Sequence, residues 1–150
     1  MPRIGIWEDR PFFSSALSSL LPDVPVIGRH PAIFSEGTFD LILIAPSASG
    51  WAGAGAVSCH LALLPGMALP LTRILQADSA ISYGTASRDT LTISSLDPQQ
   101  ISVALQREIL TLSGQTLEPQ EFVLSAPEYT DPLSFLALTG ARLLLTGRPE

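Results

Sequence analysis

Short apolar runs alternate with polar or amphipathic stretches through the first 84 residues of the chain. The runs are RIGIW, VPVIG, DLILIA, CHLALLPG and SAISYG. Each has the length of a strand, and continuous apolar runs of this kind are typical of strands buried on both faces of a sheet. The pattern therefore predicts an α/β fold with a small open, mostly parallel sheet and flanking helices.

Two stretches between these runs carry apolar residues at helical spacing. Residues 8–21 predict a first helix, because Pro11 suits an initial turn. Residues 69–78 show the same spacing and predict a second helix. Residues 30–39 are expected to form a connector or one helical turn. Residues 46–58, rich in Gly, Ala and Ser, are expected to form a loop.

The pattern becomes β-rich after Gly84. The strand-like stretches are 90–94, 101–112 and 117–125, and turn signals stand at Asp97-Pro98 and Ser113-Gly114. Such close spacing favours hairpins and antiparallel pairing. The middle stretch stays ambiguous between strand and helix, because its apolar spacing suits both.

The last apolar stretch, residues 130–147, predicts a C-terminal helix. Thr130 or Asp131 can cap it, and Gly147 suits its end, whereas Gly140 weakens it. We therefore expect one α/β domain over residues 1–150. A subdivision near residue 84 would separate a Rossmann-like half (1–84) from a β-rich half with the C-terminal helix (85–150).

Composition narrows the class of protein. The chain has 150 residues, of which 46% are hydrophobic and 15% charged, so it is expected to fold around a buried core. No apolar run reaches about 18 residues, and the N-terminus lacks a secretory pattern, so we expect a cytoplasmic protein that does not enter membranes. A net charge of −6 argues against nucleic acid as a partner.

The residue types that are scarce exclude several chemistries. The chain has eight Arg and no Lys, so Schiff bases and a P-loop lysine are ruled out. One Cys and two His do not make a four-ligand structural zinc site without carboxylates or a second chain, and they offer little material for acid–base catalysis. We therefore expect no metal and no cofactor.

The glycine-rich loop is the first candidate for ligand binding. Gly53 and Gly55 follow an apolar run, and backbone N–H groups of such a turn can approach a phosphate. However, Ser58 stands where the dinucleotide motif has its third glycine. A surface loop is the preferred interpretation, and a small anion or nucleotide phosphate is the ligand expected if the loop binds one.

Two other polar groups are better explained structurally. Cys59 and His60 are adjacent on a strand and point to opposite faces, so a buried Cys that does not pair with His60 is expected. Glu8 and Asp9 follow the first strand, where receiver-like proteins hold a metal. The rest of that pattern is missing, so helix capping by Asp9 is preferred.

The junction between the two halves, Tyr83 to Asp89, is the second candidate. Tyr83, Gly84 and Arg88 would form the rim of a site for a small anionic ligand, with Arg88 as the anion donor. The alternative is a turn in which Asp89 bonds nearby backbone N–H groups, and this interpretation is preferred.

Three hypotheses for function remain. The preferred one is a non-catalytic α/β domain that binds a small anionic or nucleotide-like ligand, or plays a regulatory role. The second is a carboxylate-dependent transferase or hydrolase that uses Asp89, Glu118 and Glu121. The third is a homo-oligomeric structural or interaction protein, in which Leu143 to Leu145 bury against another subunit.

Two stretches of the second half carry a resemblance to known sequences. SYGTASRDTLTISSL (82–96) and LQREILTLSGQTLEPQEF (105–122), together with LLPG (63–66), resemble a group of small uncharacterised bacterial proteins, mostly from clostridial-type Firmicutes. The resemblance implies no activity and supplies no catalytic residues to carry over.

Overall fold

A computed structural model describes residues 3–8, 12–20, 26–28, 38–47, 57–68, 75–126 and 131–150. The strands are β1 (Ile4–Trp7), β2 (Val26–Gly28), β3 (Thr38–Ile44), β4 (Val57–Pro65), β5 (Leu75–Gly84), β6 (Leu91–Leu96), β7 (Gln100–Leu105), β8 (Ile109–Leu110), β9 (Thr116–Leu117) and β10 (Gln120–Ser125). The helices are α1 (Phe13–Leu20) and α2 (Pro132–Thr146). The chain therefore has a mixed α/β fold in which strands predominate.

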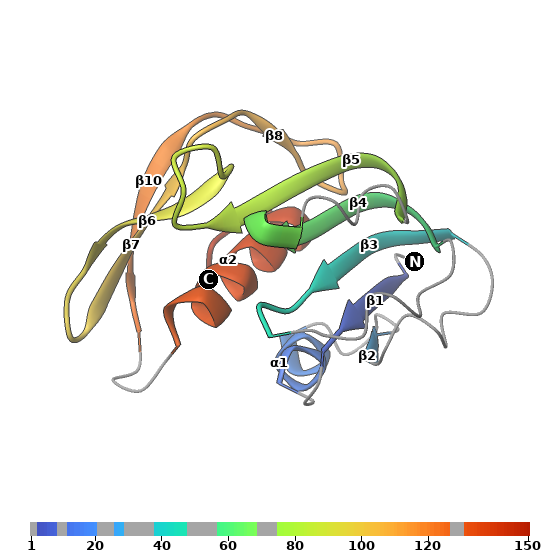
Figure 1. The fold of residues 1–150 in the computed structure, drawn as a ribbon, viewed down its shortest axis with the longest axis horizontal. Helices are drawn as coiled ribbons and strands as arrows, with labels where there is room; N and C mark the ends of the chain where they lie inside the picture. Colours follow the sequence, from blue (N-terminus) through green and yellow to red (C-terminus); the bar gives the residue numbers. More distant parts are fainter. Residues whose placement is uncertain are drawn as a thin grey trace.

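Eight strands form one sheet in the order β10-β7-β6-β5-β4-β3-β1-β2 (Figure 1). Every neighbouring pair from β2 to β6 is parallel. The apolar runs explain this part, because β1 and residues 41–44 of β3 are fully buried, as strands covered on both faces must be. The prediction of a mostly parallel sheet is confirmed.

The last strands pair in the antiparallel sense. β7 lies between β6 and β10 and is antiparallel to both, and β8 and β9 form a separate two-stranded antiparallel sheet. Residues 101–112, which fitted either a strand or a helix, contain β7 and β8. Gly114 makes the turn between β8 and β9 with φ 90°, a conformation that glycine adopts without steric cost.

β5 and β6 join the two parts of the sheet. They are parallel, but only Tyr83–Leu91 and Gly84–Thr92 pair, because β6 begins where β5 ends. A loop of residues 85–90 connects them. The outer edge of β5 before Tyr83 is thus left without a neighbouring strand in the described part of the chain.

The helix expected over residues 69–78 is a wrong prediction for its last four residues. Leu75 to Asp78 are the first residues of β5 and pair with β4 from Val57 onward. The apolar residues that fitted helical spacing also fit a period of two, because Leu75 and Ala77 share one face of the strand. Residues 69–74 lie outside the described residues, as do 48–56 of the expected loop and 30–37 of the expected connector.

Helix α2 closes one face of β4, β5 and β6 (Figure 1). Asp131 caps it by accepting a hydrogen bond from the Ser134 N–H (3.2 Å), and Gly147 ends it with φ 75°. Gly140 does not interrupt it. A Cβ there would stand 2.8 Å from Leu91, so glycine allows close helix–sheet packing.

The apolar residues of α2 are already used within this chain. Leu143 and Leu144 are fully buried in the core, so neither offers the subunit contact expected of it, and Leu145 is half-buried and packs against the same core. Neither of the two described helices has the length and apolar character needed to cross a membrane.

Candidate functional site

A pocket of about 200 Å³ lies at the carboxyl ends of β4 and β5, and we call it the strand-end pocket. Its walls are the turn after β4, the loop between β5 and β6, and the first turn of α2. The residues lining it are Pro65, Gly66, Met67, Tyr83, Gly84, Thr85, Ala86, Arg88, Asp89 and Leu133. The carboxyl ends of parallel strands are where α/β sheets generally hold their ligands.

The loop between β5 and β6 folds back on itself through Asp89. The Asp89 N–H donates to the Ala86 carbonyl (3.0 Å), and the Ala86 N–H donates to Asp89 Oδ2 (3.0 Å). This is the turn expected from the sequence, in which a short acidic side chain satisfies nearby backbone. It fixes Asp89 with its carboxylate toward the ends of β4 and β5.

Side chains after β7 clamp the same loop from outside. Gln106 Nε2 donates to the carbonyls of Asp89 (2.6 Å) and Ser87 (3.2 Å), and Arg107 Nη1 donates to the Arg88 carbonyl (2.7 Å). Neither clamp was predicted, because nothing in the sequence pairs residues 106–107 with 87–89. The clamp holds the loop by its backbone, which leaves the Arg88 side chain unrestrained.

Two glycines make room for the Asp89 carboxylate. A Cβ at Gly66 would lie 2.2 Å from Asp89 Oδ1, and a Cβ at Gly84 would lie 2.5 Å from Oδ2. Both separations are far below van der Waals contact, so any other residue would displace the carboxylate. Gly84 was predicted to belong to a site, whereas Gly66 was not.

One oxygen of Asp89 is buried without a partner. The residue is 2% exposed, and Oδ1 makes no hydrogen bond within the part of the chain that the structure describes. A buried acceptor without a donor costs about 1–3 kcal/mol, more if it is charged. Such a group in a native site needs a compensating donor, which a bound molecule can supply.

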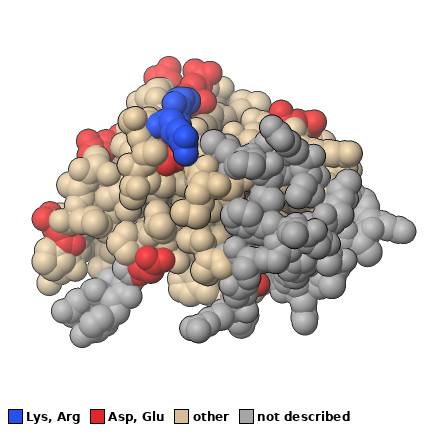
Figure 2. Space-filling model, viewed as in Figure 1, with Lys and Arg blue, Asp and Glu red and all other residues tan. Residues whose placement is uncertain are grey.

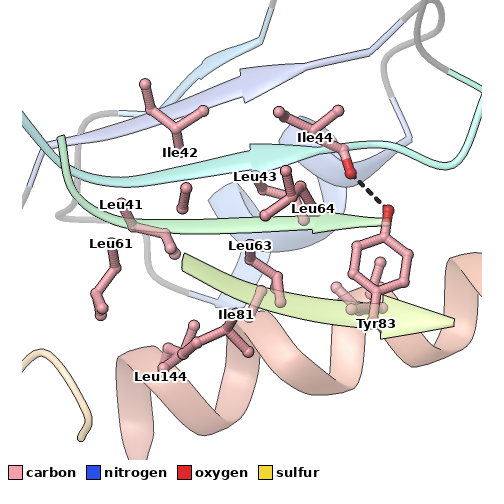
Figure 3. Close-up of a cluster of buried hydrophobic side chains, with 14 of the residues drawn as sticks. Leu41, Ile42, Leu43, Ile44, Leu61, Leu63, Leu64, Ile81, Tyr83 and Leu144 are labelled. Atoms are coloured by element: carbon pink, nitrogen blue, oxygen red, sulfur yellow. Dashed lines mark hydrogen bonds between the residues drawn. The ribbon is translucent and has the colours of Figure 1, made fainter. Parts of the chain in front are cut away.

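Tyr83 supports the sheet rather than presenting its hydroxyl to a ligand. The Tyr83 side chain crosses β4, and its hydroxyl donates a hydrogen bond to the Ile44 carbonyl at the end of β3 (2.5 Å; Figure 3). Burial, and secondarily the charge of Asp131, raises the pKa of the Tyr83 hydroxyl well above its ordinary value. Tyr83 therefore lines the pocket with its ring and binds the ends of three strands together.

Arg88 stands at the rim of the strand-end pocket with an exposed side chain. Its guanidinium makes no ion pair with any described residue. Figure 2 shows basic side chains over the loop between β5 and β6, with acidic side chains beside them. A free guanidinium at a pocket rim is suited to a planar anion such as a carboxylate or phosphate.

The structure thus brings together four of the six residues expected at a ligand site: Tyr83, Gly84, Arg88 and Asp89. The other two, Gly53 and Gly55, lie outside the described residues.

Glu8 caps helix α1. Its carboxylate accepts hydrogen bonds from the N–H groups of Phe13 (2.8 Å) and Ser14 (3.2 Å), and from the Ser14 hydroxyl (2.5 Å). Capping was expected of Asp9, which lies outside the described residues. Glu8, at the end of β1, was not predicted to cap the helix, and its side chain is long enough to reach the first turn of α1.

The carboxylates of the catalytic hypothesis do not gather around Asp89. Glu121 is on β10, which β7 and β6 separate from β5, and it accepts a hydrogen bond from the Ser94 hydroxyl. Glu118 is exposed between β9 and β10. Among the described residues, no three His, Cys, Asp or Glu side chains are grouped to hold a metal.

A polar pair between β4 and β5 was not predicted from the sequence. His60 Nδ1 and Asp78 Oδ2 are 2.8 Å apart, and this hydrogen bond raises the pKa of His60 above its ordinary 6.5. Cys59 faces the other way and is buried, as expected. Its burial, and secondarily the charge of Asp78, raises the pKa of the thiol to about 11. The sequence signal for this pair was the same alternation of polar residues in both strands, at Ser58 and His60 in β4 and at Gln76 and Asp78 in β5.

Comparisons with known proteins supply no relative. No protein-family model, no curated protein and no solved structure matches the chain.

Proposed function

We propose that the protein binds a small anionic or nucleotide-like ligand in the strand-end pocket and performs no catalysis on it. The observation that carries the proposal is that, among the described residues, Asp89 Oδ1 is buried without a hydrogen-bond partner in a pocket whose rim also holds an Arg88 guanidinium without an ion pair. A ligand hydroxyl or amine would donate to Asp89, and an anionic group would accept from Arg88.

The size of the pocket limits what it holds. At about 200 Å³ it is smaller than the roughly 300–1,000 Å³ of typical sites for drug-sized molecules. A sugar phosphate, or the ribose phosphate of a nucleotide with its base outside, suits this volume. Ribose hydroxyls are commonly bound by an acidic side chain in α/β folds, which agrees with the role given to Asp89.

Entry of the ligand requires the loop to move. Asp89 Oδ1 is closed off from solvent, whereas Thr85 to Arg88 are all exposed. Residues 85–88 would swing outward and close again over the ligand. The Gln106 and Arg107 contacts, which hold only backbone carbonyls, would be the ones to break.

We further infer that residues 1–84 form a Rossmann-like half. Its support is the all-parallel order β2-β1-β3-β4-β5, one of the two common orders of doubly wound sheets. In such sheets the switch in strand order, here between β1 and β3, also marks a crevice. Residues 9–11 and 48–56, which follow β1 and β3 in the sequence, lie outside the described residues, so the proposal relies on the strand-end pocket.

Thermal shift against adenosine and guanosine phosphates, sugar phosphates and inorganic phosphate tests the proposal. We expect at least one compound to raise the Tm, and Arg88→Ala and Asp89→Asn each to abolish the shift. Arg148→Ala, which removes the same charge at the far end of α2, is expected to keep it. If no compound gives a shift, or Arg88→Ala keeps it, the proposal fails.

The same samples separate binding from catalysis. The compound that binds is expected to be recovered unchanged after long incubation, as measured by phosphorus NMR. Turnover that is lost in Asp89→Asn would instead support the transferase or hydrolase hypothesis.

A further inference from the structure

The side of β5 that faces away from β4 is what we call its outer edge. This edge lies in the middle of the sheet and not at either end of the strand order. β5 pairs with β4 over its whole length, but its other side meets β6 only at Tyr83 and Gly84. From Gln76 to Ile81 that side has no backbone hydrogen bond to the described residues. Every second residue of a strand points its N–H and C=O toward a given side, so this edge carries a row of donors and acceptors that no described residue pairs.

A second backbone segment runs along this edge two strand positions from β5, so that one strand position lies between them. β7 runs beside β6, and the bond from the Gln106 N–H to the Thr90 carbonyl (2.8 Å) is the last contact on the line of β6. Residues 107–110 then continue past the start of β6, so β6 does not lie between these residues and β5. Adjacent strands lie about 4.8 Å apart, so two positions leave roughly 10 Å, the space of one strand.

The space between these two segments is a pocket of about 420 Å³, which we call the edge slot. Ser79–Ile81 of β5 form one wall, Arg107–Leu110 form the other, and Thr90 closes one end. Figure 1 shows β8 arching past β5 on this side of the molecule. The edge slot is separate from the strand-end pocket, with which it shares no lining residue.

The edge slot lacks the devices that normally block strand addition. Exposed edges are usually protected by proline, lysine or a bulge. Residues 76–82 contain none of these, and Gln76, Asp78, Ser79 and Ala80 are exposed with small or polar side chains. Within the described residues, the edge is therefore exposed and borders a pocket that an added strand can enter.

We propose that the edge slot binds an extended segment of a partner protein by strand addition, with its backbone bonded to β5 on one side and to residues 107–110 on the other. Strand addition of this kind takes affinity from backbone hydrogen bonds and specificity from alternate side chains. The segment would continue the line of β6 and complete the sheet.

Charge defines the chemistry of this segment. Glu108 lines the edge slot, is exposed and makes no ion pair within the described residues, and the whole chain carries −6. The only basic side chain in the lining, Arg107, donates to the Arg88 carbonyl. The segment therefore has a Lys or Arg opposite Glu108. A second copy of this chain would offer the two end strands of its sheet. β10 would bring Glu121 against Glu108 with like charge, and β2 is only 3 residues long.

Selection from a random library of linear peptides tests the proposal. Peptides enriched on the wild-type protein are synthesised with blocked ends, and their Kd values are measured by fluorescence anisotropy. We expect enriched peptides to alternate β-branched residues with at least one Lys or Arg. N-methylation of every second amide should weaken binding about tenfold or more in either register, because a strand in the edge slot bonds on both sides.

Protein variants supply the matched comparison. Glu108→Lys is expected to weaken binding of the basic peptides, whereas Glu118→Lys, the same charge change at an exposed site between β9 and β10, is expected to leave it intact. Failure to enrich any peptide, binding that survives N-methylation in one or both registers, or equal loss in the two Glu variants would each overturn the proposal. A dimer in sedimentation that Glu108→Lys disperses would also overturn it, because the occupant would then be a second copy.

Discussion

The two halves of β5 differ in burial along one continuous strand. From Ile81 to Gly84 the strand is buried. From Gln76 to Ala80 it is exposed or half-exposed, although both halves pair with the same strand, β4. β6 lies alongside the end of the buried half, and α2 packs against the strand. In the described part of the chain, the exposed half has no strand on its outer side.

This difference shows that the position of a strand in the order of a sheet does not decide its burial. The exposed half is as central in the sheet as the buried half, but it has no second neighbouring strand among those that the structure describes. Its side chains are correspondingly polar or small, and its pair His60–Asp78 is open to water, with side chains 57% and 76% exposed. Each half therefore has its own candidate site: the strand-end pocket at the buried end and the edge slot along the open side.

Amide hydrogen exchange gives the largest expected contrast between the halves. Tyr83 and Gly84 have strands on both sides, so both amides should be protected. Between Gln76 and Ala80 only alternate amides bond to β4, so the others should exchange faster by about a thousandfold or more. Uniform protection along β5, measured residue by residue by NMR, would show that the outer edge is covered.

Removal of the Tyr83 ring should cause the largest loss of stability. Tyr83→Ala is expected to lower the free energy of unfolding by about 3–5 kcal/mol, because it empties a fully buried site. Tyr83→Phe keeps the ring and should cost about 1–3 kcal/mol, the effect of an unpaired Ile44 carbonyl. Chemical denaturation measures both, and equal losses in the two variants would contradict the role given to the hydroxyl.

A side chain at Gly84 should have a smaller effect at the same end of β5. Gly84→Ala is expected to cost about 1–3 kcal/mol, since its Cβ overlaps Asp89 Oδ2 and displaces the bond to the Ala86 N–H. The double variant with Asp89→Ala should recover much of that loss, because the overlap is gone. Strictly additive losses in urea denaturation would mean that the carboxylate is not what the methyl group meets.

The smallest effect is expected at the exposed half. The hydrogen bond to Asp78 raises the pKa of His60 above 6.5 in the folded protein. Its stabilising contribution is therefore fully present below about pH 6.5 and is lost as pH rises through the folded pKa. In NMR titrations Asp78→Asn should lower the pKa of His60, and the exposed-site control Asp97→Asn should not. An unchanged His60 pKa in Asp78→Asn would mean that the pair does not form in solution.

Much of the fold follows from local sequence pattern. β1, β3 and β4 are apolar runs that need burial on both faces, and the cap residues Asp131 and Gly147 set the limits of α2. The start of β5 was predicted as helix because its exposed residues remove the apolar run that identified the other parallel strands. The exposure of this first part of β5 depends on where β6 begins beside it, and local sequence pattern does not predict that position.

The candidate site was predictable in place but not in detail. The loop at Arg88-Asp89 was identified as a junction between halves, and its turn was expected from Asp89. The contact of Asp89 with Gly66 was not, because the two are 23 positions apart in the sequence and meet only when β4 and β5 align. The clamp by Gln106 depends in the same way on the return of β7 beside β6.

The contact between Asp89 and the two glycines has a consequence for the divergence of this sequence. Gly66, Gly84 and Asp89 form a unit in which each residue limits what the other two can be. A relative that gains a side chain at position 66 or 84 must lose the carboxylate at 89 or rebuild the loop. The three positions are thus expected to change together or not at all. Substitutions at these three positions would distinguish related sequences that retain the strand-end pocket from those that have lost it.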